Sequence, residues 1–457
     1  MARYQTEPLK CLRKAKELRD GLYKQIAKAR DDGRMIVAGG AESAIALAAG
    51  FDMEFLAGEP YAAKCVLAGA SDSSNYTKYF EAAEAAKFPR DLCSYMRLNI
   101  GSLLCNSFIF GGAYPKPAFN LQTHICDTQG KWYQIISELE GVPYNALDVM
   151  PFEWEAEQES EASRDLKRKY LQEQMLDIID WMERITGQRY DDDRFIAAVN
   201  WECEATNLWA QCCMVNRSIP AVMDEKMMQS LYIVAVLMRQ RKEAVDFYRE
   251  LLDELQDRAA RGIAAFAEER LRVLYDGQPP WHSLEIYYYL EEYGAVAIGS
   301  SLSFGLSGGW AYDQAQETRF PAKPPREAGV VLKTREEVCA WYANWLLDTN
   351  TVLRSLRFSG RGKNKYILDL YKKWRADAVM IHLNRGCEGT AVGQLEVRSF
   401  LAENDIPVMT FEGNMADVRD FDKPRTKSTI ATFMDMLGVE KLRGEPQIRP
   451  GKQKYDG

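Results

Sequence analysis

The ten cysteines of this 457-residue sequence are its most versatile chemical groups. A thiol can pack in a core, bind a metal or do redox work, and composition does not choose between these roles. Cys93, Cys126 and Cys387 are far apart along the chain, and no two cysteines form a C-x-x-C pair or a ferredoxin-like run. Spacing alone therefore favours packing over metal binding, without excluding either.

The other seven cysteines are predicted to pack in the interior. Cys212 and Cys213 are adjacent, which is not the spacing of local metal ligands, and Cys203 is close to them in a predicted helical region. The same role is expected for the remaining four, which are Cys11, Cys65, Cys105 and Cys339.

Distinctive motifs surround the first three cysteines. They read DLCSYMR around Cys93, ICDTQGKWY around Cys126 and NRGCEGTAVGQLEVRSF around Cys387. Further motifs are YDGQPPW at 275–281, GGWAYDQ at 308–314 and MTFEGNMADVRDF at 409–421. Together they span nearly the whole chain, and they resemble the subunit family shared by class I benzoyl-CoA reductases and 2-hydroxyacyl-CoA dehydratases.

That resemblance implies a [4Fe-4S] cluster held between two α/β lobes. Cys93, Cys126 and Cys387 stand at the places of its three cysteine ligands, so the fourth iron has no protein thiolate. Such an iron can bind water or a substrate oxygen, whereas a cluster with four thiolates only passes electrons. The resemblance therefore implies a cluster that faces an acyl-CoA substrate.

The resemblance also implies partners that deliver the electrons. The chain lacks the phosphate loop G-x-x-x-x-G-K-[ST], because SGRGKNK at 359–365 fails both its spacing and its final hydroxyl. ATP would therefore be used by separate ATP-hydrolysing activator subunits, with ferredoxin as the upstream donor. A paralogous subunit with its own cluster would complete the enzyme.

The substrate is the harder question. GGWAYDQ and the chain length resemble the larger active-site subunit (B/O type) of class I ATP-dependent benzoyl-CoA reductase, and Ala41 stands where dehydratases carry a hydroxyl residue. The leading hypothesis is an oxidoreductase subunit of anaerobic aromatic degradation, which reduces benzoyl-CoA or methylbenzoyl-CoA to a cyclic diene. The alternatives are an (R)-2-hydroxyacyl-CoA dehydratase subunit and a non-catalytic electron-relay subunit.

Three polar residues are candidates to act beside the cluster. Glu59 matches a family position that tends to be acidic, and Gln394 matches a recurrent glutamine that could bind cluster sulfide or substrate. His124, two residues before Cys126, could deliver a proton. Each has a plainer reading as a loop carboxylate, a helix-surface amide or a structural histidine. His282 and His382 are expected to be structural.

Apolar strand candidates alternate with helical patterns in two regions, which predicts an α/β protein with two doubly wound, Rossmann- or flavodoxin-like lobes. The expected strands are 34–38, 51–56, 118–125, 145–150, 271–275, 294–299, 376–383 and 407–411. The predicted organisation is an N-terminal helical segment 1–30, a first lobe 31–155, a helical segment 156–268, a second lobe 269–442 and a tail 443–457. Cys126 and Cys387 follow strands, where such folds place their sites.

Composition excludes two classes of partner. The net charge of −8 and pI near 5.3 come from mixed acids and bases, without the basic block that binds nucleic acid. The apolar stretch Leu231–Met238 is far shorter than the roughly 20 residues that a membrane span needs. The first residues lack the apolar core of a signal peptide, so we expect a cytoplasmic protein without membrane contact.

Overall fold

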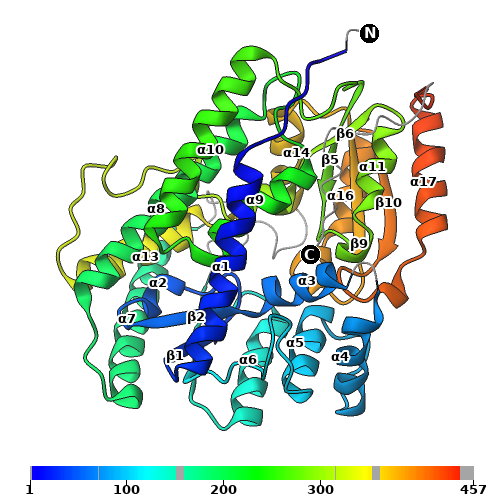
Figure 1. Ribbon diagram of the computed structural model, residues 1–457. Helices are drawn as coiled ribbons and strands as arrows, with labels where there is room; N and C mark the ends of the chain where they lie inside the picture. Colours follow the sequence, from blue (N-terminus) through cyan, green and yellow to red (C-terminus); the bar gives the residue numbers. More distant parts are fainter. Residues whose placement is uncertain (1–2, 70–71, 151–158, 314, 352–360, 443–457) are drawn as a thin grey trace.

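Eight short apolar segments form two four-stranded parallel β-sheets in the computed structural model (Figure 1). The structure describes residues 3–69, 72–150, 159–313, 315–351 and 361–442. The predicted tail 443–457, the predicted boundary at residue 155 and the start of SGRGKNK lie outside these ranges. The α/β class with two lobes is confirmed, and every expected strand is present within a few residues.

The two sheets share one topology. The first has the order β2-β1-β3-β4, and the second has the order β10-β9-β5-β6. When the strands of the second lobe are numbered from β5 and the order is read from β6, it is again 2-1-3-4. The first sheet comprises β1 (Met35–Gly39), β2 (Met53–Ala57), β3 (Phe119–Thr123) and β4 (Tyr144–Leu147). The second comprises β5 (Leu271–Asp276), β6 (Ala295–Ser300), β9 (Ala378–Asn384) and β10 (Val408–Gly413). The strands are largely apolar because both faces of a parallel sheet are covered, although β3 also carries the buried polar residues Asn120, Gln122 and Thr123.

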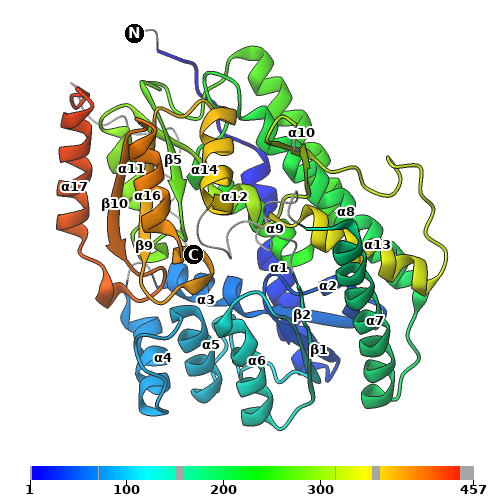
Figure 2. The same ribbon diagram turned by 180° about the vertical axis from the view of Figure 1, so that it is seen from behind.

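Alternating residues of the second sheet pack on opposite helices. Val273 and Tyr275 of β5 share a core with α11 (Glu285–Glu291) and α17 (Lys423–Met436). Leu274, between them, faces the main core on the other side, where α14 (Arg361–Lys373) and α16 (Gln394–Glu403) pack. Helices therefore cover both faces of this sheet, as Figure 2 shows from behind.

The first sheet and its surroundings carry most of the remaining helices. Those next to it in sequence are α1 (Cys11–Asp31), α2 (Ile45–Ala48), α3 (Gly58–Ala68), α4 (Ser74–Ala85), α5 (Ser94–Leu104) and α6 (Asp127–Glu140). The N-terminal helix α1 lies almost entirely within the helical segment expected at 1–30. Its second half is kept helical by burial, because Leu22, Tyr23 and Ile26 are covered on one face.

Long helices connect the two lobes, in the region where the sequence predicts a helical segment. They are α7 (Glu161–Thr186), α8 (Asp192–Val215), α9 (Glu225–Met238) and α10 (Lys242–Arg261), with α13 (Arg335–Thr349) packed against α7 and α8. Gly187 ends α7 in the left-handed conformation, as expected of a C-cap glycine. The apolar stretch Leu231–Met238 belongs to α9, and no helix within the described ranges is long and apolar enough to cross a membrane.

The GGWAYDQ motif contributes to a small antiparallel hairpin that the sequence did not predict. Its strands are β7 (Trp310–Asp313) and β8 (Thr318–Pro321), while Gln314 is outside the described residues. Trp310 stacks on Phe304 with ring centroids 3.8 Å apart, and its indole N–H donates to the Phe304 carbonyl. Phe304 belongs to the short helix α12 (Ser301–Gly305). The motif thus attaches the hairpin to the hydrophobic core through Trp310.

A buried ion pair ties the two lobes together. Arg97 on α5 donates to Asp417 at 3.0 Å, and neither side chain is exposed. Asp417 begins the short helix η3 (Val418–Asp420) in the second lobe. Because breaking a buried pair leaves an uncompensated charge, this contact holds α5, which begins after Cys93, against the second lobe.

Candidate functional site

Each sheet has a point where the connections leaving neighbouring strands diverge. In the first sheet β1 lies between β2 and β3, and in the second β5 lies between β6 and β9. Ligands of open α/β sheets bind at such switch points, beyond the carboxyl ends of the strands. Cys126 follows β3 and Cys387 follows β9, so each of these cysteines lies at the switch point of its own sheet.

The two switch points open into one cavity of about 910 Å³, measured with the solvent at its mouth. Residues after strands of both sheets line it, including Ala41 after β1, Glu59 after β2, Gln278 after β5 and Met415 after β10. The fold therefore aims the carboxyl ends of both sheets at the same space.

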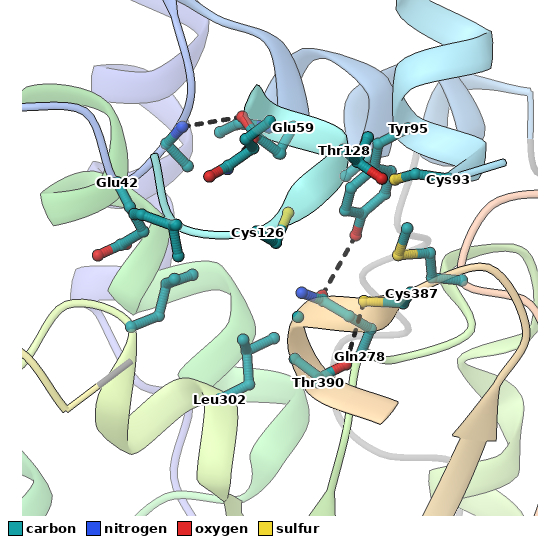
Figure 3. Close-up of a pocket in the computed structure, with 18 of the residues that line it drawn as sticks. Glu42, Glu59, Cys93, Tyr95, Cys126, Thr128, Gln278, Leu302, Cys387 and Thr390 are labelled. Atoms are coloured by element: carbon teal, nitrogen blue, oxygen red, sulfur yellow. Dashed lines mark hydrogen bonds between the residues drawn. The ribbon is translucent and has the colours of Figure 1, made fainter. Parts of the chain in front are cut away.

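Cys93, Cys126 and Cys387 all line this cavity, and their sulfur atoms point toward one another (Figure 3). Each cysteine is the N-cap residue of a helix: Cys93 of α5, Cys126 of α6 and Cys387 of the one-turn α15 (Glu388–Ala391). Backbone N–H groups of the following turn lower the pKa of each thiol. They belong to Tyr95 and Met96 for Cys93, to Gln129 for Cys126, and to Gly389 and Thr390 for Cys387. Amides in this position stabilise negative charge on sulfur.

The three cysteines are half-buried, and the protein around their sulfur atoms disfavours the charged thiolate. Burial raises the pKa of Cys126 to about 12 and raises the pKa of Cys93 and Cys387 as well. Thiolates in such surroundings need a metal to replace the proton. Among the described residues, no group of three or more His, Cys, Asp or Glu side chains is arranged to hold a metal ion. A cubane iron-sulfur cluster places different demands on its ligands than a single metal ion, because each thiolate binds a different iron. Three inward-facing thiols with nearby amide donors fit such a cluster.

The other seven cysteines behave largely as predicted. Six are buried, and none of the seven lines the cavity. Cys105 is the exception: it is exposed, because it is the C-cap residue of α5 at the molecular surface. The packing prediction was wrong for this residue.

A buried lysine supports the turn that carries Cys387. Gly386, at φ +75°, turns the chain after β9, and the Thr390 hydroxyl lies 3.2 Å from the Cys387 sulfur. Lys363 on α14 donates to the carbonyl groups of Thr390 and Val392, the latter at 3.1 Å. Burial lowers the pKa of Lys363, while Asp276 and Cys387 oppose that shift. Sequence reasoning missed this residue because it tested SGRGKNK only as a phosphate loop.

Glu59 faces the same cavity from the start of α3. Its carboxylate accepts hydrogen bonds from the backbone N–H of Ala41, at 2.8 Å, and from the side chain of Gln129 (Figure 3). Burial raises the pKa of Glu59 above its ordinary value, although these hydrogen bonds partly counteract it. The site thus holds an oriented carboxyl group that can retain a proton where an exposed glutamate would not.

His124 and Gln394 do not line the cavity. The His124 ring lies 3.1 Å from the Tyr144 hydroxyl on β4. Gln394 donates to Asp276 at 3.1 Å and is fully covered. Of the other histidines, His382 stacks on Phe411, and burial lowers its pKa to about 4. His282 donates from Nε2 to the Asn414 carbonyl at 2.9 Å, a contact that fits a structural role.

Tyr95 and Gln278 are cavity residues that sequence reasoning did not single out. The Trp281 indole donates to the Tyr95 hydroxyl, which in turn donates to Gln278 at 3.4 Å (Figure 3). This chain links α5 of the first lobe to the turn after β5. The signal was available, because Tyr95 lies in DLCSYMR while Gln278 and Trp281 lie in YDGQPPW.

Glu42 lies at the cavity wall, but its carboxyl group points away from the three cysteines (Figure 3). It accepts from Asn350 at 2.9 Å, and its other oxygen has no hydrogen-bond partner among the described residues. Burial raises its pKa to about 7, with Arg239 opposing and Glu59 adding to the shift.

The raised pKa of Glu42 predicts a loss of stability with rising pH. The folded carboxyl binds its proton more tightly than the unfolded one, whose pKa is 4.5. The contribution of Glu42 to stability is therefore complete below pH 4.5 and is lost as pH rises toward about 7, by at most about 3 kcal/mol. Glu42→Gln should flatten this part of the profile, measured as urea midpoints at pH 5 and pH 8. Equal slopes in Glu42→Gln and wild type would contradict the assignment, and the exposed Glu403→Gln serves as control.

Two α/β lobes that share a cavity lined by three cysteines and a buried carboxyl group define a class of two-lobed α/β enzyme. Within it, residues 44–437 match the family model described as 2-hydroxyglutaryl-CoA dehydratase, D-component, and the chain belongs to this family.

Curated relatives agree with the family model. The chain is 26% identical over 368 residues to the (R)-phenyllactyl-CoA dehydratase alpha subunit of Clostridium sporogenes, covering 79% of this chain and 80% of the relative. It is also 26% identical to the (R)-2-hydroxyisocaproyl-CoA dehydratase alpha subunit of Clostridioides difficile, covering 93% and 95%. Identity to the (R)-2-hydroxyglutaryl-CoA dehydratase alpha subunit of Acidaminococcus fermentans is 23%, covering 71% and 61%.

These findings overturn the prediction of a benzoyl-CoA reductase in aromatic degradation. The family model and these relatives are dehydratase components. The structure explains the error: GGWAYDQ anchors a hairpin whose described residues do not line the cavity, so this motif carries no information about substrate. Ala41 does line the cavity, but it binds Glu59 through its backbone N–H, and this contact requires no hydroxyl side chain.

Proposed function

We propose that this chain is the alpha subunit of an (R)-2-hydroxyacyl-CoA dehydratase, which removes water from its substrate to form a 2-enoyl-CoA. In this reaction the C2–O bond and a C3–H bond break, and the oxygen leaves with two hydrogens as water. The observation that supports the proposal most is the meeting of Cys93, Cys126 and Cys387 with the carboxyl group of Glu59 at one cavity.

Cys93, Cys126 and Cys387 would hold a [4Fe-4S] cluster as its three thiolate ligands. When bound, such a cluster supplies one-electron chemistry and an iron without a protein thiolate, open to a substrate oxygen. The amides that follow each cysteine offset the negative charge of the thiolates. The Arg97–Asp417 pair and the hydrogen-bond chain from Tyr95 to Gln278 hold the two ligand-bearing lobes in register.

Glu59 would provide the proton with which the substrate hydroxyl leaves as water. Its carboxyl is oriented by Ala41 and Gln129, and burial favours its protonated form. Apolar side chains line most of the rest of the cavity and exclude bulk water from the reacting atoms. Gln394 would act indirectly, by holding Asp276 beneath the turn that carries Cys387.

The proposal includes partners. Relatives named as alpha subunits imply a second, paralogous subunit for this chain, which would carry its own cluster. An ATP-hydrolysing activator, itself supplied by ferredoxin, would deliver the electron, and the enzyme would work in the cytoplasm. Because dehydration returns the electron, ATP use should be far below product formation.

The test is an anaerobic assay of the complex with its second subunit, activator, ATP and a strong reductant. We expect 2-enoyl-CoA, identified by mass spectrometry, from at least one of phenyllactyl-, 2-hydroxyisocaproyl-, lactoyl- and 2-hydroxyglutaryl-CoA. Several product molecules should form per ATP hydrolysed. A complex that contains its iron but dehydrates none of these thioesters would overturn the proposal.

A further inference from the structure

The end of the cavity away from the cysteines is apolar and mostly buried. Tyr232, Ile233 and Val236 line it from α9, and Leu302 and Leu306 line it from α12 and the residue that follows. Tyr232, Val236 and Leu302 are at most 2% exposed, while Ile233 and Leu306 are half-buried. Glu388, beside Cys387 at the opposite end, is exposed, so this end is the one nearer to solvent.

This gradient of burial orients a CoA thioester. The CoA moiety carries phosphates, which are costly to bury without partners, so it has to stay toward the open end. The reacting thioester and hydroxyl then lie near the cysteines and Glu59. The remainder of the acyl chain can only extend toward α9 and α12.

The charges around the cavity limit what that chain can carry. Its described lining contains no lysine, arginine or histidine, whereas Glu42, Glu59 and Glu388 are acidic. Arg239, the guanidinium that acts electrostatically on Glu42 of the cavity wall, is already engaged by Glu202, at 3.0 Å, and by the carbonyl groups of Ala41 and Ser43. A carboxylate at the end of the acyl chain would be buried without a counter-ion, which is strongly unfavourable.

We propose that this apolar end selects 2-hydroxyacyl-CoA thioesters with a branched aliphatic or aromatic side chain and rejects those ending in a carboxylate. The inference rests on the proposed dehydratase function and adds its substrate class. Tyr232, Ile233, Val236, Leu302 and Leu306 are the specificity-determining residues. Tyr232 offers an aromatic face and the four aliphatic side chains offer an adaptable apolar wall, which suits both kinds of side chain.

The first experiment compares kcat/KM of the complete enzyme for 2-hydroxyisocaproyl-, phenyllactyl- and 2-hydroxyglutaryl-CoA. We expect the two apolar substrates to exceed 2-hydroxyglutaryl-CoA by about 100-fold or more, the consequence of burying one unpaired charge. Isothermal titration of the same thioesters without ATP should give dissociation constants in the same order, independently of turnover. A preference for 2-hydroxyglutaryl-CoA would overturn the inference and leave the dehydratase proposal intact, whereas no dehydration of any thioester would reject the dehydratase proposal itself.

The second experiment changes the size of the apolar end. Leu302→Trp should lower kcat/KM for phenyllactyl-CoA at least 10-fold relative to lactoyl-CoA, because the indole fills space that the larger side chain needs. Ile233→Ala enlarges the cavity instead and should raise kcat/KM for phenyllactyl-CoA relative to lactoyl-CoA. It keeps the test valid if the tryptophan variant does not fold. Leu395→Ala, at an exposed side chain remote from the cavity, is the matched control. Unchanged ratios in both cavity variants would contradict the assignment.

Discussion

Replacing Cys126 by alanine should remove most of the iron from the purified subunit and abolish dehydration. Cys126 caps α6 with its sulfur facing Cys93 and Cys387, so its loss leaves two thiolates for a cluster that needs three protein ligands. We expect iron and acid-labile sulfide to fall from about four atoms each per chain to well under one. Dehydration should fall by at least about 100-fold. Cys93→Ala and Cys387→Ala should behave alike.

The matched control is Cys212→Ala. Cys212 is buried in α8, where its sulfur lies 3.9 Å from the Tyr248 carbonyl and distant from the cavity lining. This variant should keep its iron, its visible spectrum and its activity. Circular dichroism of all four variants establishes that they are folded. Full iron content in the three cavity variants, or equal loss in Cys212→Ala, would contradict the ligand assignment.

Replacing Glu59 by glutamine should reduce kcat by about 100- to 10,000-fold, the range that a positioned acid or base contributes. The amide preserves the size of the side chain and can still bond to Ala41 or Gln129, but it cannot give up a proton at this step. Iron content and acyl-CoA dissociation constants should remain close to those of wild type. This combination separates a role in proton transfer from a role in cluster binding.

The pH profile provides the second readout for Glu59. The carboxyl has to be protonated to donate, and burial raises its pKa. Wild-type activity should therefore be full at low pH and fall as pH rises through that raised pKa, while the residual activity of Glu59→Gln should not show this fall. Glu403→Gln on the exposed side of α16 is the control. An unchanged profile or an unchanged kcat in Glu59→Gln would exclude the role.

Much of the fold was predictable because apolar residues dominate most of its strands. The segment expected at 376–383 is β9 at Ala378–Asn384, and the one expected at 271–275 is β5 at Leu271–Asp276. Strands covered on both faces are mostly apolar, which is visible in sequence. The hairpin of β7 and β8 was missed, because its strands are short and mix apolar with charged residues.

The candidate site was predictable only in part. The motifs singled out Cys93, Cys126, Cys387 and Glu59, and all four meet at the cavity. Proximity in sequence to Cys126 made His124 a candidate, yet its ring lies against Tyr144. Both residues follow the end of β3, so strand alternation does not fix where their side chains point. Tyr95 and Lys363 were missed for the converse reason, since their contacts come from the other lobe or from a distant helix.

The sequence by itself determined the class of fold, the family-like motifs and the three cysteines, because apolar runs and local motifs depend on neighbouring residues. Only the tertiary structure decided that the switch points of both sheets open into one cavity, which Cys93 completes from the start of α5. It also decided that the far end of that cavity is apolar and free of cations among its described lining residues. Such properties arise from residues hundreds of positions apart, and only the packing of the two lobes places them together.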